Sequence, residues 1–187
     1  MKPGHSTSLL IVWRVAELEA KHLNAPEIEP VHLLIGLAKT VDLDLPALVS
    51  KDTADRDAIL EELLREVRRL RTIFSTAQVK PSALRRRLRG TPLGQRFRLP
   101  ESETLHRSTA ARKVFSDAEH FAQIAGVAVY PMHLLYGLLL GADPCRDEVF
   151  RELGIDKSRL LRVTKREVIF QPEDSTAATS KPKSRWN

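Results

Sequence analysis

The fold is decided by an eight-residue stretch, Pro30-Val31-His32-Leu33-Leu34-Ile35-Gly36-Leu37, which returns 101 residues later as Pro131-Met132-His133-Leu134-Leu135-Tyr136-Gly137-Leu138. Six of the eight positions are identical, and they include a proline, a histidine and a glycine, which are uncommon residues in this chain. Each copy follows an amphipathic segment with two alanines four residues apart: Ala16 and Ala20, then Ala118 and Ala122. Together these features predict a duplicated helical unit.

The residue types in this motif suit a helix that packs tightly against another helix. The proline that opens each copy fits the first turn, where a missing N–H group costs nothing. The leucines recur at helical spacing and would face the core. A glycine inside a helix lowers its stability, so Gly36 and Gly137 predict the close approach of a neighbouring helix, the alanine-lined one. We interpret His32 and His133 as packing and hydrogen-bonding residues of the repeat core.

Composition and periodicity predict an all-α protein. Hydrophobic residues make up 42% of the 187 residues, which is enough to build a sizeable core. Gly and Tyr are few, whereas Leu, Ala, Arg and Glu are plentiful, and this mixture favours helices over strands. The helices that we expect run from a cap at Ser6 or Thr7 to about Leu23, from Asp57 to Phe74, from a cap at Ser108 or Thr109, and from Asp156 to about Phe170, with Gly154 as a helix stop.

We expect one domain over residues 1–170, made of a first repeat at about 6–74 and a second at about 108–170. The intervening stretch, about 75–107, contains three prolines and two glycines, which predicts a basic linker with a short helix over Ser82–Arg89. Residues 171–187 are rich in Ser, Thr, Pro and Lys, a composition typical of a disordered tail.

The positive charge of the chain is concentrated in one stretch. The net charge is +6, yet ten Lys or Arg residues and no acidic residue lie between Val67 and Arg98. The densest part, Arg85, Arg86, Arg87 and Arg89, would suit an anionic or acidic partner. A basic helical nucleic-acid-binding protein is therefore the alternative function, although aromatic residues for base stacking are scarce there. Neutralising the four arginines should abolish nucleic-acid binding under that alternative and leave the fold intact.

The doubled His-Leu-Leu-x-Gly-Leu sequence resembles the Clp N-terminal domain of Hsp100 unfoldases such as ClpA, ClpB and ClpC. The second-copy ending Phe150-x-x-Leu153-Gly154-Ile155-Asp156-x-x-x-Leu160 and the alanine spacing carry the same resemblance, which covers roughly residues 6–168. It implies two tandem four-helix repeats with pseudo-twofold symmetry and a role in docking adaptors and substrates. The chain has no Gly-x-x-x-x-Gly-Lys-Ser/Thr phosphate loop. It is thus similar to stand-alone accessory proteins of Clp proteases, such as the ClpT type.

One departure from the family's pattern concerns the residue before the motif histidine. Many members have Glu there, and in ClpC-like domains this carboxylate helps to bind phosphorylated arginine. Here the positions hold Val31 and Met132. We therefore do not carry phosphoarginine recognition over. If these two side chains are exposed at the helix starts, they would offer an apolar protein-docking surface.

No pattern of catalytic, metal-binding or cofactor-binding residues stands out. Neither motif histidine has a second ligand at helical spacing common to both copies. Cys145 lies between Pro144 and Arg146, with no sign of a Cys/His arrangement. Glu61, Glu62 and Glu66, a possible acid/base set, lie opposite the apolar stripe of their helix and read as a solvated face. A small-molecule pocket between the repeats is conceivable, but no residues single it out.

These observations predict a non-enzymatic protein-binding module without a cofactor, most simply an accessory or adaptor-like protein of a Clp/Hsp100 unfoldase–protease system. Its partners would be Clp ATPase subunits, Clp protease subunits or their substrates. The longest apolar run near the start, Leu9–Trp13, is too short for a membrane span or a signal-peptide core. A single cysteine favours a reducing compartment, so we expect a cytoplasmic protein.

Overall fold

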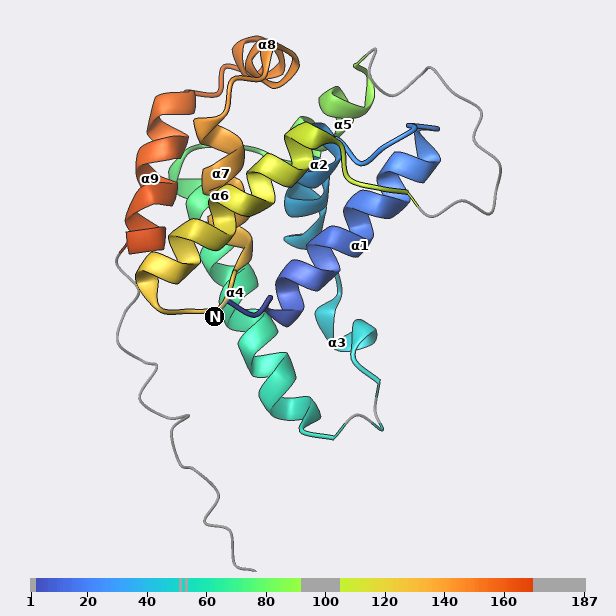
Figure 1. The fold of residues 1–187 in the computed structure, drawn as a ribbon, viewed down its shortest axis with the longest axis vertical. Coiled ribbons are helices and arrows are strands. Elements are labelled where there is room, and N and C mark those ends of the chain that lie inside the picture. Colours follow the sequence, from blue (N-terminus) through green and yellow to red (C-terminus); the bar gives the residue numbers. More distant parts are fainter. Residues whose placement is uncertain (1–2, 51, 53, 92–104, 170–187) are drawn as a thin grey trace, which may run out of the picture.

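The computed structural model describes residues 3–50, 52, 54–91 and 105–169, and every regular element in that part of the chain is a helix (Figure 1). The all-α prediction is therefore confirmed. The expected disordered tail at 171–187 and residues 92–104 of the expected linker lie outside the described residues. The helices are α1 (Thr7–His22), α2 (Pro30–Thr40), α3 (Leu45–Leu48), α4 (Arg56–Thr76), α5 (Pro81–Arg89), α6 (Thr109–Ala125), α7 (Pro131–Leu140), α8 (Pro144–Glu152) and α9 (Lys157–Ile169).

The helices begin and end where the local sequence requires. The Ser6 hydroxyl accepts a hydrogen bond from the Leu9 N–H (3.3 Å), and Ser108 does the same for Ala111 (3.1 Å), so serine caps open α1 and α6 as predicted. The two motif prolines occupy the first positions of α2 and α7. Gly154 follows α8 with a φ of +66°, a conformation that glycine adopts without strain.

The two repeats correspond helix by helix, with α1, α2, α4 and α5 matching α6, α7, α8 and α9. The turn between α4 and α5 repeats the turn between α8 and α9. In the first, the Val79 N–H donates to the Phe74 carbonyl, and in the second the Ile155 N–H donates to the Phe150 carbonyl, both at 2.8 Å. Packing is reciprocal, because α5 contacts α8 and α9 contacts α4. This is the arrangement that a pseudo-twofold axis produces.

This correspondence corrects the expected boundary of the first repeat. The stretch at 75–89 is not a linker, because its first two residues complete α4 and Pro81–Arg89 form α5. Leu84 and Leu88 of α5 are buried in the same core as the motif leucines. The short helix was predicted at 82–89, but its role as the fourth helix of the repeat was missed. The first repeat therefore extends to residue 89 rather than 74.

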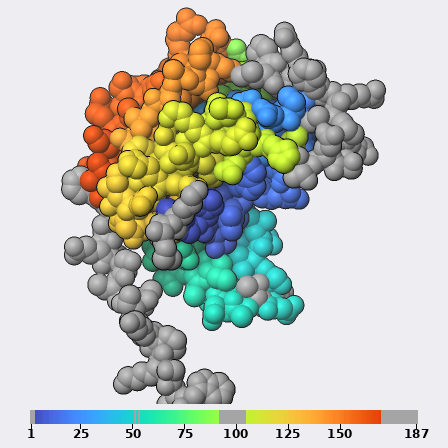
Figure 2. Space-filling model, viewed as in Figure 1, coloured from blue at the N-terminus to red at the C-terminus, as the bar shows by residue number. Residues whose placement is uncertain are grey.

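The chain segments before α1 and α6 exchange backbone hydrogen bonds with the opposite repeat. The Ser6 N–H donates to Val129 O (3.1 Å), and the Ser108 N–H donates to Ile28 O (3.2 Å). The Ile28 N–H donates in turn to His106 O (2.8 Å), and the Val129 N–H donates to Gly4 O (2.8 Å). Because these bonds are paired across the axis and one apolar core contains α2 and α7, the repeats form a single body (Figure 2).

Candidate functional site

Each motif histidine holds the first turn of its own helix. The backbone N–H of Glu29 donates to His32 Nδ1 (2.9 Å), and the N–H of Tyr130 donates to His133 Nδ1 (3.0 Å). Both rings are completely buried. A ring that accepts through Nδ1 is neutral, and burial lowers the pKa of His32 and of His133 to about 4. This is the environment that the packing interpretation expects, and the second ring nitrogen, Nε2, is buried in each case without a hydrogen-bond partner.

The motif glycines lie where neighbouring helices come closest. A Cβ atom on Gly36 would lie 2.7 Å from the backbone oxygen of Val12 in α1 and 3.4 Å from the Cβ of Ala16. On Gly137 it would lie 3.0 Å from the backbone oxygen of Val114 in α6. The structure thus places both glycines against the alanine-lined helices, as the sequence predicted.

A groove between the repeats could receive a ligand or a partner. It encloses about 320 Å³ and lies among the start of α2, the outer side of α6 and the junction of α7 with α8. We call it the inter-repeat groove. The residues that line it are Glu29, Pro30, Val31, Ala110, Lys113, Val114, Asp117, Gly137, Leu138, Gly141, Ala142, Asp143, Pro144 and Arg146.

The wall of the inter-repeat groove is held by Arg146. Its side chain is only 2% exposed. The guanidinium donates to the backbone oxygens of Leu138 and Gly141, which satisfies carbonyls at the end of α7, and to Asp147 Oδ1 (2.7 Å). A buried cation with all these partners is a structural group, so the groove offers an apolar floor with a rigid wall. The exposed cation at its rim is Lys113, which pairs with Asp117 (2.8 Å).

The expected exposure of Val31 and Met132 is not observed. Val31 is 4% exposed and Met132 is 1% exposed, because both side chains turn into the core from the first turn of their helices. Val31 contributes only to the lining of the inter-repeat groove. Any docking surface at the helix starts must therefore use their neighbours rather than these two side chains.

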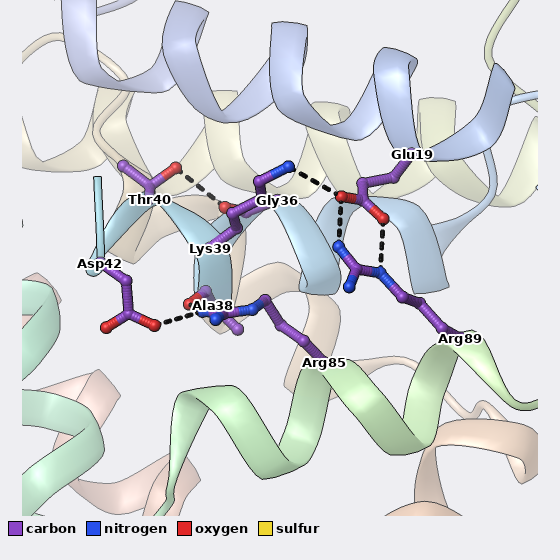
Figure 3. Close-up of polar contacts among 8 residues, drawn as sticks. All are labelled: Glu19, Gly36, Ala38, Lys39, Thr40, Asp42, Arg85 and Arg89. Atoms are coloured by element: carbon purple, nitrogen blue, oxygen red, sulfur yellow. Dashed lines mark hydrogen bonds and ion pairs between the residues drawn. The ribbon is translucent and has the colours of Figure 1, made fainter. Parts of the chain in front are cut away.

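The four arginines that were predicted to form an anion-binding patch lie on α5, and three of them bind acidic groups of the protein itself. Figure 3 shows two of these, Arg85 and Arg89. Arg85 donates to Asp42 and to the backbone oxygen of Ala38 near the end of α2. Arg89 binds both oxygens of Glu19 (2.6 and 2.8 Å). Arg87 binds Glu152 of the second repeat. The fourth, Arg86, is exposed.

The positive charges that remain for an outside partner are therefore fewer than the sequence suggests. Arg71 donates to Val41 O (2.7 Å), and Arg69 binds the carboxylate and the backbone oxygen of Glu167. Arginines thus satisfy carbonyl groups at the ends of α2 and α9, where cations are favourable. Phe97, with the last two arginines of the basic stretch, lies outside the described residues.

Glu66 is the residue that the sequence interpretation placed wrongly. It was expected on a solvated face, but it is 3% exposed and accepts hydrogen bonds from the hydroxyls of Ser6 and Ser8. Burial raises the pKa of its carboxyl to about 7, and the nearby Glu62 acts in the same direction. Its position next to the buried Val67 in the sequence is consistent with burial. The predicted apolar face of this helix contained only aliphatic and aromatic residues, so a carboxylate was not expected on it.

A second surface feature lies beside the pseudo-twofold axis, where α1 meets α6. Trp13 and Phe115 meet edge to face with ring centroids 5.7 Å apart, and the guanidinium of Arg107 lies over both rings. These residues, with His5, Leu9 and Leu10, line a smaller hollow. Leu10 is half exposed there. The cluster offers apolar surface beside one cation, a composition suited to peptide contacts.

The other candidate residue, Cys145, and the possible metal-binding side chains form no recognisable site in the described part of the chain. Cys145 is half-buried in the first turn of α8. Within the described ranges, no three His, Cys, Asp or Glu side chains are grouped as metal ligands would be. No helix in the described part of the chain has the length and apolar character needed to cross a bilayer.

Comparison with known proteins identifies the fold. Neither protein-family models nor curated protein sequences match the chain. Among solved structures, the N-terminal domain of Hsp104 from Candida albicans superposes with a TM-score of 0.61 at 16% identity, over 86% of this chain and 89% of that one. The N-terminal domain of ClpD, a caseinolytic protease associated chaperone from Arabidopsis thaliana, gives 0.53 at 16% identity, over 88% and 94%. The chain therefore has the fold of the N-terminal domains of Hsp100 and Clp chaperones.

Proposed function

We propose that this protein is a non-enzymatic protein-binding module, and specifically an accessory or adaptor-like protein of a Clp/Hsp100 unfoldase–protease system. The observation that carries the proposal is the double-repeat fold, which matches almost the whole of the Hsp104 and ClpD domains. Those domains belong to chaperones, one of which is described as associated with a caseinolytic protease. Because fold alone does not fix function, the surface chemistry has to be compatible with it.

The surface chemistry supports protein contacts better than catalysis. The inter-repeat groove combines an apolar floor with a few charged groups at its rim, and the aromatic hollow at Trp13 adds a second apolar area. The motif histidines are buried and neutral, so they offer no acid or base to a substrate. Three of the four α5 arginines are engaged in ion pairs, which weakens the case for a nucleic-acid-binding protein.

The proposal is tested by direct binding between purified proteins. The full chain, immobilised at one end, is presented with the Clp ATPase and Clp protease subunits of its own organism, with and without nuclease treatment. We expect saturable, nuclease-resistant binding to one of these subunits. A chain that binds none of the subunits, or that binds only while nucleic acid is present, would overturn the proposal.

Two matched variants locate the contact. Leu10→Asp places a charge on the half-exposed side chain beside Trp13, and Ala110→Arg places one at the mouth of the inter-repeat groove. The control is Ile124→Asp, because that side chain is 72% exposed and lines neither the inter-repeat groove nor the hollow at Trp13. Loss of binding in one of the first two, with the control unchanged, assigns the docking surface.

A further inference from the structure

The pseudo-twofold axis gives the inter-repeat groove a counterpart in the other half of the molecule, and that counterpart is filled. By the helix correspondence, the groove positions Ala110, Lys113 and Val114 on α6 match Ser8, Ile11 and Val12 on α1. In the same way the start of α2 matches the start of α7, where Tyr130 lies. The two sites are therefore built from the same backbone elements.

The counterpart is filled by the first turns of α4. This helix has 21 residues, whereas its equivalent α8 has 9, and the extra length lies at the N-terminal end (Figure 1). Leu63 and Val67 of the extension are each 1% exposed and pack, with Leu45, against Ile11. Glu66, between them on the same side, accepts the Ser6 and Ser8 hydroxyls. The second repeat has no such extension, so its groove stays open.

We propose that the inter-repeat groove binds an amphipathic helix of a partner protein that presents the same pattern as the α4 extension. That pattern is two aliphatic side chains four residues apart with a carboxylate one residue before the second, as in Leu63, Glu66 and Val67. The inference rests on the proposed protein-binding function and names the class of partner. Of the two related sites, one is thus filled by a helix of the chain itself, and the other has the same construction and is open.

The groove is suited to this occupant in its size, and its rim carries one exposed cation beside the carboxylates of Glu29, Asp117 and Asp143. The accessible apolar lining includes Pro30, Ala110, Ala142 and Pro144, against which aliphatic side chains lose water-exposed area. A cavity of about 320 Å³ takes side chains but not a helix backbone, so the helix lies across the mouth, as in other helix-in-groove complexes. Where Ile11 lies in the filled site, the open groove has Lys113, 72% exposed, which can pair with the carboxylate of the partner.

The probe is a synthetic peptide with the sequence of residues 56–70 of α4, capped at both ends and fluorescently labelled, titrated into the full chain. We expect one peptide to bind per chain with a dissociation constant on the order of 0.1–1 mM, since a short helix loses entropy on ordering. Ala110→Arg should weaken binding about tenfold or more, which corresponds to 1.4 kcal/mol. Ala125→Arg, at an exposed alanine on the other end of α6, should leave it unchanged.

A charge exchange separates specific docking from unspecific adhesion. Lys113→Glu in the chain should weaken the native peptide, and a peptide with Glu66→Lys should restore binding to that variant. A peptide with Leu63→Asp should not bind. Thermal unfolding of each chain variant, measured alongside, shows that the fold is retained, because both substituted side chains are exposed.

Two results would overturn the inference. One is the absence of any binding at peptide concentrations up to about 1 mM. A dissociation constant of that size corresponds to a binding free energy of roughly −4 kcal/mol, the least that we expect of a short helix. The other is binding that ignores Ala110→Arg and Lys113→Glu, which would mean that the peptide exchanges with α4 in the filled site. Neither result bears on binding to Clp subunits, which is measured with the full chain and no peptide, so the two proposals fail separately.

Discussion

Single residues set the pH dependence of this fold. His32 and His133 are neutral because each accepts a backbone N–H through Nδ1 inside the core, and burial lowers the pKa of each to about 4. The unfolded chain protonates its histidines near pH 6.5. Between pH 6.5 and pH 4 the unfolded state therefore binds more protons, and stability falls as the pH falls.

We predict that each motif histidine removes about 1.4 kcal/mol of stability per pH unit over that range. Urea unfolding at pH 7.5 and pH 5.0 measures the loss. His32→Gln keeps an acceptor for the Glu29 N–H but cannot be protonated, so the loss between the two pH values should shrink by about half in this variant. An unchanged pH dependence in His32→Gln would show that the ring is not buried in its neutral form.

Glu66 acts in the opposite direction. Its pKa is raised to about 7, so its contribution to stability is complete below the unfolded value near 4.5 and is lost as the pH rises through 7. We predict that Glu66→Gln stabilises the protein at pH 8.5 by about 1–3 kcal/mol and has little effect at pH 4.5. The exposed Glu61→Gln is the control. Urea titrations at both pH values distinguish this from a general effect of removing a charge.

The motif glycines are required by distance rather than by backbone conformation. At Gly36 an added Cβ atom would lie 2.7 Å from a backbone oxygen of α1, which cannot rotate away, whereas at Gly137 the distance is 3.0 Å. We predict that Gly36→Ala lowers the free energy of unfolding by about 2–3 kcal/mol and Gly137→Ala by about 1 kcal/mol or less. Alanine has a higher helix propensity than glycine, and this offsets part of the loss of stability in both variants. Equal effects in thermal unfolding would contradict this ranking.

At the scale of elements, α5 is held against the rest of the molecule by its arginines. Glu19, whose side chain is 4% exposed, receives Arg89 from α5 and Lys39 from α2. Burial works to raise the pKa of Glu19, but its hydrogen bonds to Arg89 and Lys39 outweigh that effect and keep the pKa below its usual value. An almost fully buried carboxylate depends on such partners.

We predict that Arg89→Ala destabilises the fold by about 1–3 kcal/mol, a range reduced because the Arg89 side chain is itself partly exposed. Arg86→Ala, the exposed neighbour on the same helix, should change stability by less than about 0.5 kcal/mol. Chemical denaturation of both variants measures the difference. This prediction differs from the sequence expectation that all four α5 arginines could be neutralised without disturbing the fold, and the same experiment decides between them.

At the scale of the whole molecule, the repeats share one core and exchange hydrogen bonds at the ends of α1 and α6. We predict a single cooperative unfolding transition, with the calorimetric enthalpy equal to the van 't Hoff enthalpy. A fragment of residues 1–91 should lack a cooperative transition, since its inner apolar face loses the second repeat. Two resolved transitions, or a fragment that unfolds cooperatively, would show that the repeats are independent domains.

The sequence by itself determined the helices, the duplication and the fold class. The His-Leu-Leu-x-Gly-Leu motif, the serine caps and the alanine spacing act within a few residues, and local chemistry of this kind can be read along the chain. It also led to the resemblance that the structural comparison supports. The close approach at Gly36 was predictable for the same reason, because only a glycine opposite small residues permits it.

Only the tertiary structure decided which polar groups are buried and which charges are paired. Arg89 and Glu19 are 70 residues apart in the chain, and Arg69 and Glu167 are 98 apart, so no local pattern joins them. Val31 and Met132 are buried in one apolar core built from both repeats, and Glu66 is buried where it accepts the hydroxyls of Ser6 and Ser8, 60 and 58 residues away in the chain. Whether a groove is open or filled is a property of packing between distant segments, which a single sequence does not encode in its local spacing.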